Sequence, residues 1–512
     1  MREKDKKNTR NRTQDNEIEV ISFNLEPEHV RKQNAAHKSR KREEQEKATG
    51  NHEFARVTYL FVTIFLAMMG YLVYFNVVKS KDIINSPYNV RLDSMADRVV
   101  RGKILDNEGN VLAKTDVQED GSETRIYPYG NMFAHVVGYD SKGKSGLEST
   151  ANFHLLTSNA NFMEQFVHEL KEEKNIGDNV ITTLDMTLQE AAYNALGDYK
   201  GAVVITEVTT GKIMAMMSKP DFNPNTISED WSEIANSSGS MLLNRVTQGA
   251  YAPGSIFKLV TALEYMRENK AYNSYNYTCE GEIEYEGTVI HCAKNRKHGE
   301  EDLAASLANS CNTSFSNIGL NLNISGIQKT AKGLLFNTKL PSLFPYSQSK
   351  FQLEKEDPTS EIMMTAIGQG ETLVSPYHMV LIASAIGNGG ILMEPYLVDR
   401  IESHTGSSVE KNMPRKYTEL MTSQEASVLK DYMLKVVENG TASALKSEKY
   451  VVAGKTGTAE YSSDKDKAHS WFMGFTNVEN PELVISVVVE SADQSGMTAI
   501  SVAKKVFNAY YY

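Results

Sequence analysis

The longest apolar stretch of the chain covers residues 57–78, which read VTYLFVTIFLAMMGYLVYFNVV and include no charged side chain. A helix of this length measures about 33 Å and can cross the hydrocarbon core of a bilayer. Tyr59 near one end and Tyr71 and Tyr74 near the other suit the membrane interfaces. The stretch therefore predicts one transmembrane helix, since a buried core helix seldom avoids polar residues so completely.

A cleaved signal peptide is the competing interpretation of this stretch. Its apolar core would be shorter, its leader would not exceed fifty residues, and no small-x-small cleavage site follows the stretch. Six basic residues lie within the twenty residues before the stretch (Lys38, Arg40, Lys41, Arg42, Lys47 and Arg56), and two directly follow it (Lys79 and Lys81). We therefore predict a retained single-pass membrane anchor with a cytoplasmic N-terminus and an extracytoplasmic main body.

Beyond the anchor the pattern alternates between amphipathic helices and apolar strands. Residues 187–199 predict a helix with a threonine cap, and residues 498–510 predict a closing helix. The predicted strands are the two arms of a hairpin over 201–218 and the segments 450–452, 471–475 and 483–490. Because short turns join sequential strands, we expect a five-stranded antiparallel sheet flanked by helices, an α/β fold of the α+β type.

The same pattern divides the chain into four parts. Residues 1–56 are polar with few large apolar groups, which predicts a disordered cytoplasmic tail before the anchor at 57–78. Residues 101–113 predict strand, turn and strand with Gly109 in the turn, so residues 79–185 are expected to form a β-rich extracytoplasmic domain. Residues 186–512 are expected to form the larger domain.

Charge is distributed unevenly along the 512 residues. The net charge is −11, but residues 1–56 hold 14 Lys and Arg against 11 Asp and Glu, so the remainder carries −14. An acidic main body argues against nucleic acid as a partner.

The candidate chemistry centres on a helix predicted to begin at Ser255, directly after Pro253 and Gly254. Ser255 and Lys258 lie three residues apart, on one side of the first turn. The start of a helix is electropositive, which favours both an alkoxide and a neutral amine. Ser255 is therefore a candidate nucleophile with Lys258 as its base. Ser-x-x-Lys recurs at Ser141, Ser347, Ser427, Ser443, Ser462 and Ser501, where two polar residues on a solvated surface are the simpler interpretation.

Two more motifs follow in the chain. Ser310 and Asn312 form a Ser-x-Asn motif, which also occurs at Ser22 and Ser274, whereas Lys455-Thr456-Gly457 occurs once. In this order the three motifs resemble those of penicillin-binding proteins and class A β-lactamases.

The resemblance narrows to class B penicillin-binding proteins, the peptidoglycan D,D-transpeptidases, of the type with a short pedestal domain. It rests on RGKILDNEGNVLA at 101–113, Gly146-Leu147-Glu148 and FAHVVGY at 133–139. The resemblance implies a serine β-lactamase-like transpeptidase domain behind a β-rich pedestal, with no separate glycosyltransferase domain. It also implies cleavage of a D-Ala-D-Ala bond in a stem peptide, covalent penicillin binding, and work beside a polytopic glycosyltransferase of the SEDS family.

The resemblance also implies roles for individual residues. Ser310 would relay a proton to the leaving amine, and Asn312 would hold the substrate amide. Lys455 would tune Ser310 electrostatically, while Thr456 and Thr458 would contact the terminal carboxylate. The N–H groups of Ser255 and Thr458 would form the oxyanion hole. From its residue type alone, Gly457 allows close approach of backbone.

Two other functions fit parts of this pattern. A β-lactamase would use the same motifs, but the anchor, the pedestal and the long interval from Asn312 to Lys455 argue against it. A β-lactam sensor or a catalytically silent scaffold is the second alternative, although a sensor normally has more spans or a cytoplasmic effector domain. The sequence leaves open whether the biological role is in division, elongation or sporulation.

Several other residues allow both functional and structural interpretations. Cys279, Cys292, His291 and His298 lie close in sequence, yet their spacing matches no paired-ligand pattern, so we expect no metal and no cofactor and favour a Cys279–Cys292 disulfide. We have expectations for four more residues. Cys311 should be a small buried residue, Trp471 should pack the sheet, and Glu460 and His469 should lie either at the cleft or on the solvated surface.

Overall fold

The computed structural model describes residues 27–79, 96–171, 173–460, 468–492 and 496–512. The chain divides into two compact units, Met1–Asp82 and Ile83–Tyr512. The first part of the predicted tail, residues 1–26, and the start of the predicted pedestal, residues 80–95, lie outside the described residues.

The N-terminal unit contains one long helix, α1 (Glu28–Tyr74), followed by a short π-helical turn, Phe75–Lys79. Its segment Phe54–Tyr74 is long and apolar enough to cross a membrane, by length and composition. The helix begins well before the predicted anchor, so the segment from Glu28 to residue 56 is helical where the sequence predicts disorder. This segment is rich in Ala, Lys, Arg, Glu and Gln, which all have high helix propensity.

The larger unit is built around a five-stranded sheet with the order β17-β18-β19-β7-β8, in which every neighbouring pair is antiparallel. This confirms the predicted sheet. Its strands are β7 (Gly201–Glu207), β8 (Ile213–Lys219), β17 (Val452–Glu460), β18 (Ala468–Thr476) and β19 (Leu483–Val489). Strand β17, which contains the Lys-Thr-Gly motif, lies at one edge of this sheet.

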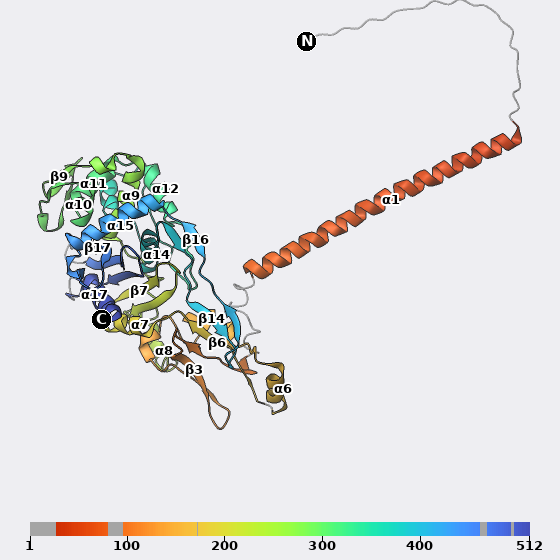
Figure 1. Ribbon diagram of the computed structural model, residues 1–512, viewed down its shortest axis with the longest axis horizontal. Helices are drawn as coiled ribbons and strands as arrows, with labels where there is room; N and C mark the ends of the chain where they lie inside the picture. Colours follow the sequence, from red (N-terminus) through yellow and green to blue (C-terminus); the bar gives the residue numbers. More distant parts are fainter. Residues whose placement is uncertain (1–26, 80–95, 172, 461–467, 493–495) are drawn as a thin grey trace, which may run out of the picture. The chain divides into compact units, whose positions relative to one another are not determined.

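Helices cover both faces of the sheet (Figure 1). Val203 and Ile205 share a core with α7 (Met186–Leu196) and α17 (Ala499–Tyr511). Val204, the next residue along from Val203, belongs to the other core, which includes helix α14 (Pro376–Gly387). This alternation follows from the period of two along a strand, and it explains why these strands are apolar without interruption.

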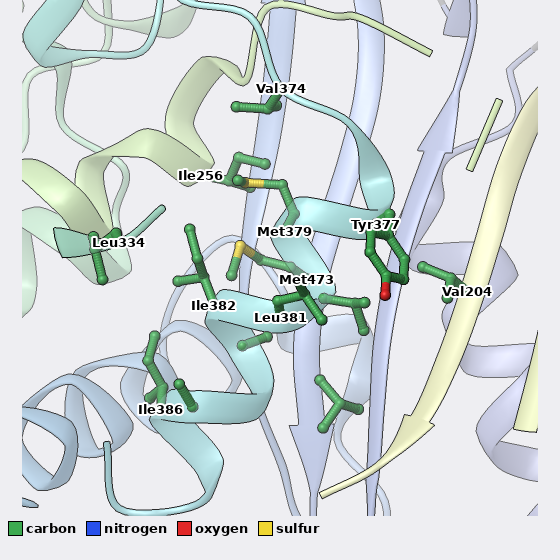
Figure 2. Close-up of a cluster of buried hydrophobic side chains, with 14 of the residues drawn as sticks. Val204, Ile256, Leu334, Val374, Tyr377, Met379, Leu381, Ile382, Ile386 and Met473 are labelled. Carbon is green, nitrogen blue, oxygen red and sulfur yellow. The ribbon is translucent and has the colours of Figure 1, made fainter. Parts of the chain in front are cut away.

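Helix α14 (Pro376–Gly387) is buried along its whole length. Figure 2 shows its Met379 beside Ile256, which is the residue after the candidate nucleophile. A helix that is apolar on every side is stable only when packing surrounds it. The turn that contains Ser255 is therefore anchored in the main core of the domain.

The remaining helices of the larger domain form a subdomain beside the β17 edge of the sheet. They are α9 (Lys258–Glu268), α10 (Leu303–Ala308), α11 (Asn312–Asn321), α12 (Ile324–Gly333), α13 (Thr359–Ala366) and α15 (Ser423–Glu438). The short helix α8 (Trp231–Ala235) is not part of this subdomain. Between α9 and α10 the chain forms four short strands: β9 (Tyr277–Cys279), β10 (Glu282–Tyr285), β11 (Thr288–His291) and β12 (Gly299–Glu301). They pair as two separate two-stranded sheets, β10-β11 and β12-β9.

A second, six-stranded sheet has the order β15-β14-β6-β2-β3-β4. Its strands are β2 (Ile104–Leu105), β3 (Val111–Val117), β4 (Glu123–Ile126), β6 (Asn179–Thr182), β14 (Val398–Glu402) and β15 (Ser408–Lys411). The predicted strand–turn–strand at 101–113 is confirmed as β2 and β3. Strands β14 and β15 come from the larger domain's part of the chain. Strand β14 pairs with β6 and β15 pairs with β14, and the sequence does not predict this pairing.

Smaller elements complete the unit. These are the parallel pair β1 (Val99–Val100) and β5 (Asn175–Ile176), the antiparallel pair β13 (Ile391–Met393) and β16 (Lys416–Glu419), and the helices α4 (Gly146–Thr150), α5 (Asn152–Leu155) and α6 (Phe162–Leu170).

A buried ion-pair network joins the six-stranded sheet to α4. Glu148 is fully buried, and its two carboxylate oxygens accept from Arg101 Nε at 2.5 Å and Arg125 Nε at 2.7 Å. Burial alone raises the pKa of Glu148, but the two arginines outweigh that effect and hold the pKa below its usual value. If α4 moved away from the six-stranded sheet, Glu148 or the two arginines would be left as buried charges without a partner, which is costly. The network therefore stabilises the packing of α4 against this sheet.

Candidate active site

Ser255 lies in a 3-10 turn, Gly254–Phe257, that leads directly into α9 at Lys258. The predicted helix start is thus confirmed to within one turn. Ser255 is half-buried, while Ile256 and Phe257 beside it are buried in the core. Among the described residues no hydrogen bond joins Ser255 Oγ to Lys258, whose amine donates instead to Ser310 and Asn312.

Gly254 allows this turn to approach strand β17. Its φ is +55°, and a Cβ atom there would lie 2.3 Å from the carbonyl oxygen of Thr458. The N–H of Gly254 donates to the carbonyl oxygen of Gly368 at 2.8 Å, which holds the turn from the other side. A side chain at residue 254 would push the candidate nucleophile away from the strand, so this glycine is a positional requirement.

Ser310 occupies the link between α10 and α11 and has a φ of +57°. Its N–H donates to Leu307 O at 3.2 Å, and the N–H of Cys311 donates to Ser306 O at 2.9 Å, which ends α10. Cys311 then caps α11, whose first residue is Asn312. Positive φ is uncommon for residues other than glycine and marks positions held by their surroundings.

Lys258 joins the first motif to the second. It is fully buried, and its Nζ donates to Ser310 O at 2.7 Å, Asn312 Oδ1 at 2.7 Å and Ser310 Oγ at 3.4 Å. The amide of Asn312 is fixed at its other end, where Nδ2 donates to the carbonyl oxygen of His291 at 2.9 Å. These bonds orient both side chains of the Ser-x-Asn motif toward one amine.

Lys455 joins the third motif to the same hydroxyl. It lies on β17 opposite Met473 of β18 and is fully buried. Its Nζ donates to Ser310 Oγ at 3.0 Å and to Thr456 O at 3.0 Å. Ser310 Oγ therefore accepts hydrogen bonds from both lysine amines, one from each of the other two motifs, although the three residues are far apart in the chain.

Both amines lose their protons more easily than a lysine in water. Burial lowers the pKa of Lys258 to about 8, although nearby acidic groups, Cys311 first, act in the opposite direction. Burial also lowers the pKa of Lys455, and the positive charge of Lys258 lowers it further. A desolvated amine disfavours its charged form, so this pair is suited to exchange protons near neutral pH.

The other residues of the third motif lie where β17 passes the Ser255 turn. A Cβ atom at Gly457 would lie 3.0 Å from Pro253 O and 3.2 Å from Ile256 Cγ2, so the missing side chain lets the strand pack against this turn. Thr458 is exposed, and Thr456 is half-buried. Thr441, which the sequence does not single out, shares a 2.6 Å hydrogen bond between its Oγ1 and that of Thr456.

Three other predicted positions also have clear surroundings. Trp471 is fully buried and its Nε1 donates to Ala252 O at 3.1 Å, which confirms that it packs the sheet. His469 stacks edge-on against Tyr251, with ring centres 5.4 Å apart, and its Nδ1 accepts from Ser491 N. Glu460 is exposed at the end of β17.

The cysteines differ from the expectation. Cys279, Cys292 and Cys311 are all buried and free, with Cys279 Sγ and Cys292 Sγ 3.7 Å apart, so the favoured disulfide is absent among these described residues. Cys311 is buried as expected.

Comparison with known proteins agrees with this geometry. Residues 201–512 match the family of the penicillin binding protein transpeptidase domain. The chain belongs to this family. Residues 101–180 match the dimerisation domain of penicillin binding protein A.

Two named relatives and one solved structure agree with this family assignment. The chain is 25% identical over 469 residues to the peptidoglycan D,D-transpeptidase PbpA of Mycolicibacterium smegmatis, covering 86% of this chain and 94% of the relative. It is 25% identical over 442 residues to the peptidoglycan D,D-transpeptidase MrdA of Acinetobacter baumannii, covering 75% of this chain and 66% of that relative. The fold is similar to a ceftriaxone acyl-enzyme complex of penicillin-binding protein A from M. tuberculosis, with a TM-score of 0.74 at 25% identity, covering 82% of this chain and 99% of the other.

Proposed function

We propose that this protein is a serine-type D-Ala-D-Ala transpeptidase that crosslinks peptidoglycan stem peptides through an acyl-enzyme at Ser255. The observation that carries the proposal is the convergence of Lys258 and Lys455 on Ser310 Oγ, beside the turn that presents Ser255. The named relatives and the acyl-enzyme structure support the same assignment.

In the first step Ser255 Oγ attacks the carbonyl carbon of the penultimate D-Ala. Its proton passes to neutral Lys258, and the bond between that carbon and the nitrogen of the terminal D-Ala breaks. The leaving nitrogen takes a proton through Ser310, which both lysines contact. Terminal D-Ala then departs, and the peptide remains as an ester on Ser255.

In the second step an amine of a neighbouring stem peptide attacks the ester carbonyl. A new amide bond forms, the ester bond breaks, and a proton returns to Ser255 Oγ. We assign the oxyanion hole to the N–H groups of Ser255 and Thr458, since Gly254 brings the turn against the backbone of Thr458. We assign the carboxylate contact to Thr456 and Thr458, and the substrate amide contact to Asn312.

We also propose how the protein is anchored in the membrane and how its domains are arranged. The helix segment Phe54–Tyr74 would anchor it in the membrane by a single pass, and the basic residues that precede this segment favour a cytoplasmic N-terminus. Residues 79–185 would form the pedestal and residues 186–512 the catalytic domain. A polytopic glycosyltransferase of the SEDS family would supply the glycan strands whose peptides are joined.

Mass spectrometry of the full-length protein in detergent tests the assignment. After incubation with penicillin, one adduct should map to the peptide that contains Ser255 and be absent in Ser255→Ala. The control is Ser427→Ala, which alters a Ser-x-x-Lys pair on the exposed face of α15 and should leave the adduct unchanged. An adduct on another serine would overturn the site assignment, and release of the adduct within seconds would favour a β-lactamase.

Turnover separates the enzyme from a silent sensor or scaffold. With a stem peptide that ends in D-Ala-D-Ala and an acceptor amine, the protein should release D-Ala and form the crosslinked product. Penicillin binding at Ser255 without any D-Ala release would favour the sensor.

A further inference from the structure

Glu301 is a buried carboxyl group that the chemistry described above does not use. It is the last residue of β12 and is 2% exposed. Its neighbours in the chain, Glu300 and Asp302, are exposed, so burial singles out the middle one of three consecutive acidic residues. A glutamate is almost never fully buried unless it is paired, which directs attention to the groups around Glu301.

One carboxylate oxygen of Glu301 holds the residue that precedes Ser310. Glu301 Oε1 accepts from Asn309 Nδ2 at 2.7 Å. Asn309 ends α10, and its own N–H donates to the carbonyl oxygen of Ala305 at 2.8 Å. Ser310 follows directly, in the backbone conformation with positive φ. The bond to Asn309 therefore ties β12 to the short link that presents the Ser310 hydroxyl.

The other carboxylate oxygen lacks a direct partner. Glu301 Oε2 is buried and has no hydrogen-bond partner among the described residues. A buried carboxylate that is only partly hydrogen-bonded is costly unless a positive charge lies near it. The environment of Glu301 therefore favours a cationic group close by.

Lys258 supplies that positive charge. Its Nζ donates to the carbonyl oxygen of Ser310 at 2.7 Å, one residue along the chain from the Asn309 that Glu301 holds. Burial lowers the pKa of Lys258 to about 8, and the charge of Glu301 is one of the influences that act against this lowering. Glu301 and Lys258 thus stabilise each other's charged forms across the link that contains Ser310.

Other titratable groups also face Lys258, each from a different element. Lys455 on β17 carries the same sign of charge and opposes protonation of its neighbour. Cys311 at the start of α11 and Cys292 just after β11 act on Lys258 in the same direction as Glu301. A test of Glu301 must therefore change its charge while leaving these three groups in place.

From this arrangement we propose that Glu301 is a positioning residue of the active site, which holds the backbone before Ser310 and supplies the counter-charge to protonated Lys258. The proposal rests on the function assigned to Ser255. In that reaction neutral Lys258 takes the proton of Ser255 and becomes an ammonium group inside the protein. Because a buried ammonium group is costly without a negative charge nearby, Glu301 makes Lys258 a stronger base.

The pH profile of penicillin acylation, measured on the full-length protein in detergent, tests this role. Glu301→Gln keeps an oxygen that can accept from Asn309 and removes the charge. Without that charge the pKa of Lys258 falls, so the midpoint of the profile should move to lower pH by about one unit. The rate on the plateau above the midpoint should fall by about threefold, because a weaker base takes the proton of Ser255 less readily.

The matched control is Glu300→Gln, which removes the same charge from the exposed neighbour on β12 and should change neither midpoint nor plateau. Glu301→Asp keeps the charge on a shorter side chain, so its midpoint should stay close to that of wild type even where its melting temperature is lower. A wild-type midpoint in Glu301→Gln, or the same displacement in Glu300→Gln, would overturn the proposal.

Melting temperatures at pH 7 give a second test that needs no reaction. Glu301→Gln should lower the melting temperature of the wild-type protein, because Lys258 loses its counter-charge. In a Lys258→Met background the same change should raise it, because the buried carboxylate is then the group without a partner. Equal effects of Glu301→Gln in the two backgrounds would contradict the pairing.

Mass spectrometry separates this proposal from the assigned function. A penicillin adduct at Ser255 in wild type and in Glu301→Gln would uphold the function whatever the midpoints are. No adduct at Ser255 in wild type would reject the function, while the melting temperatures would still decide whether Glu301 and Lys258 are paired.

Discussion

Lys258 and Lys455 contact the same hydroxyl from two different elements of the fold, and their surroundings differ. Lys258, at the start of α9, donates to Ser310 O, Asn312 Oδ1 and Ser310 Oγ. Lys455, on β17, donates to Ser310 Oγ and Thr456 O. Both side chains are fully buried, so burial alone does not distinguish them.

The difference lies in acceptors and in neighbouring charge. An ammonium group has three N–H donors, and Lys258 finds three acceptors whereas Lys455 finds two. Acidic groups near Lys258 support its charge, while Lys258 itself disfavours charge on Lys455. These surroundings favour loss of the proton from Lys455 before Lys258, and in the proposed reaction Lys258 would make the proton transfers.

The largest expected effect comes from removing the Lys258 amine. Lys258→Met should lower the rate of penicillin acylation by about 10³-fold, since no base remains beside Ser255. Lys258→Arg should lose as much, because a guanidinium keeps its proton. The measurement is the second-order rate of labelled penicillin attachment, with circular dichroism to verify the fold. An arginine variant within tenfold of wild type would contradict the assigned role.

Ser310→Ala removes the hydroxyl on which the two lysines meet. The acylation rate should fall by about 10²-fold, because the path for a proton to the leaving nitrogen is interrupted. The control Ser316→Ala changes another buried serine, on α11, whose Oγ donates to Met363 O at 3.3 Å, and should react at the wild-type rate. Equal rates for the two variants would show that Ser310 takes no part.

The acylation rate should depend on pH through Lys258. Neutral amine is the active form, and its fraction increases with pH until the pH exceeds the pKa of about 8. The rate should therefore rise by about tenfold per pH unit below that value and level off above it. Acylation measured across this range, with protein stability checked at each pH, tests the expectation, and a flat profile below pH 8 would refute it.

The smallest expected change is in the midpoint of that profile for Lys455→Met. This variant should react more slowly, yet its midpoint should stay within a few tenths of a pH unit of wild type, because a neutral Lys455 exerts no charge on Lys258. If Lys455 were protonated instead, its removal would relieve repulsion, raise the pKa of Lys258 and move the midpoint to higher pH.

Local patterns were enough to predict the five-stranded sheet of the large domain, its helices α7, α9 and α17, and the residues of the three motifs. Uninterrupted apolar runs predict β7, β18 and β19 because both faces of that sheet are buried. A charge-free run predicts the membrane-length segment of α1. The motif residues follow from residue type and order, and Lys258, Ser310, Asn312 and Lys455 do meet.

The tail and the smaller sheet show where local patterns fail. Residues 28–56 have few large apolar groups but high helix propensity, and propensity rather than core burial accounts for their helix. Strands β14 and β15 are short and partly or fully exposed, so they carry no strong pattern. They are defined by pairing alone, β14 with β6 and β15 with β14.

The contacts at the site were decided by tertiary packing. Spacing in the chain groups His291 with Cys279, Cys292 and His298, but folding turns the backbone of His291 toward Asn312 and brings Cys311 into the cluster instead. Likewise, nothing near Gly254 in the chain indicates its contact with Thr458. Periodicity reports which side of an element is buried, whereas the partner that covers it comes from a distant segment and depends on how the whole domain packs.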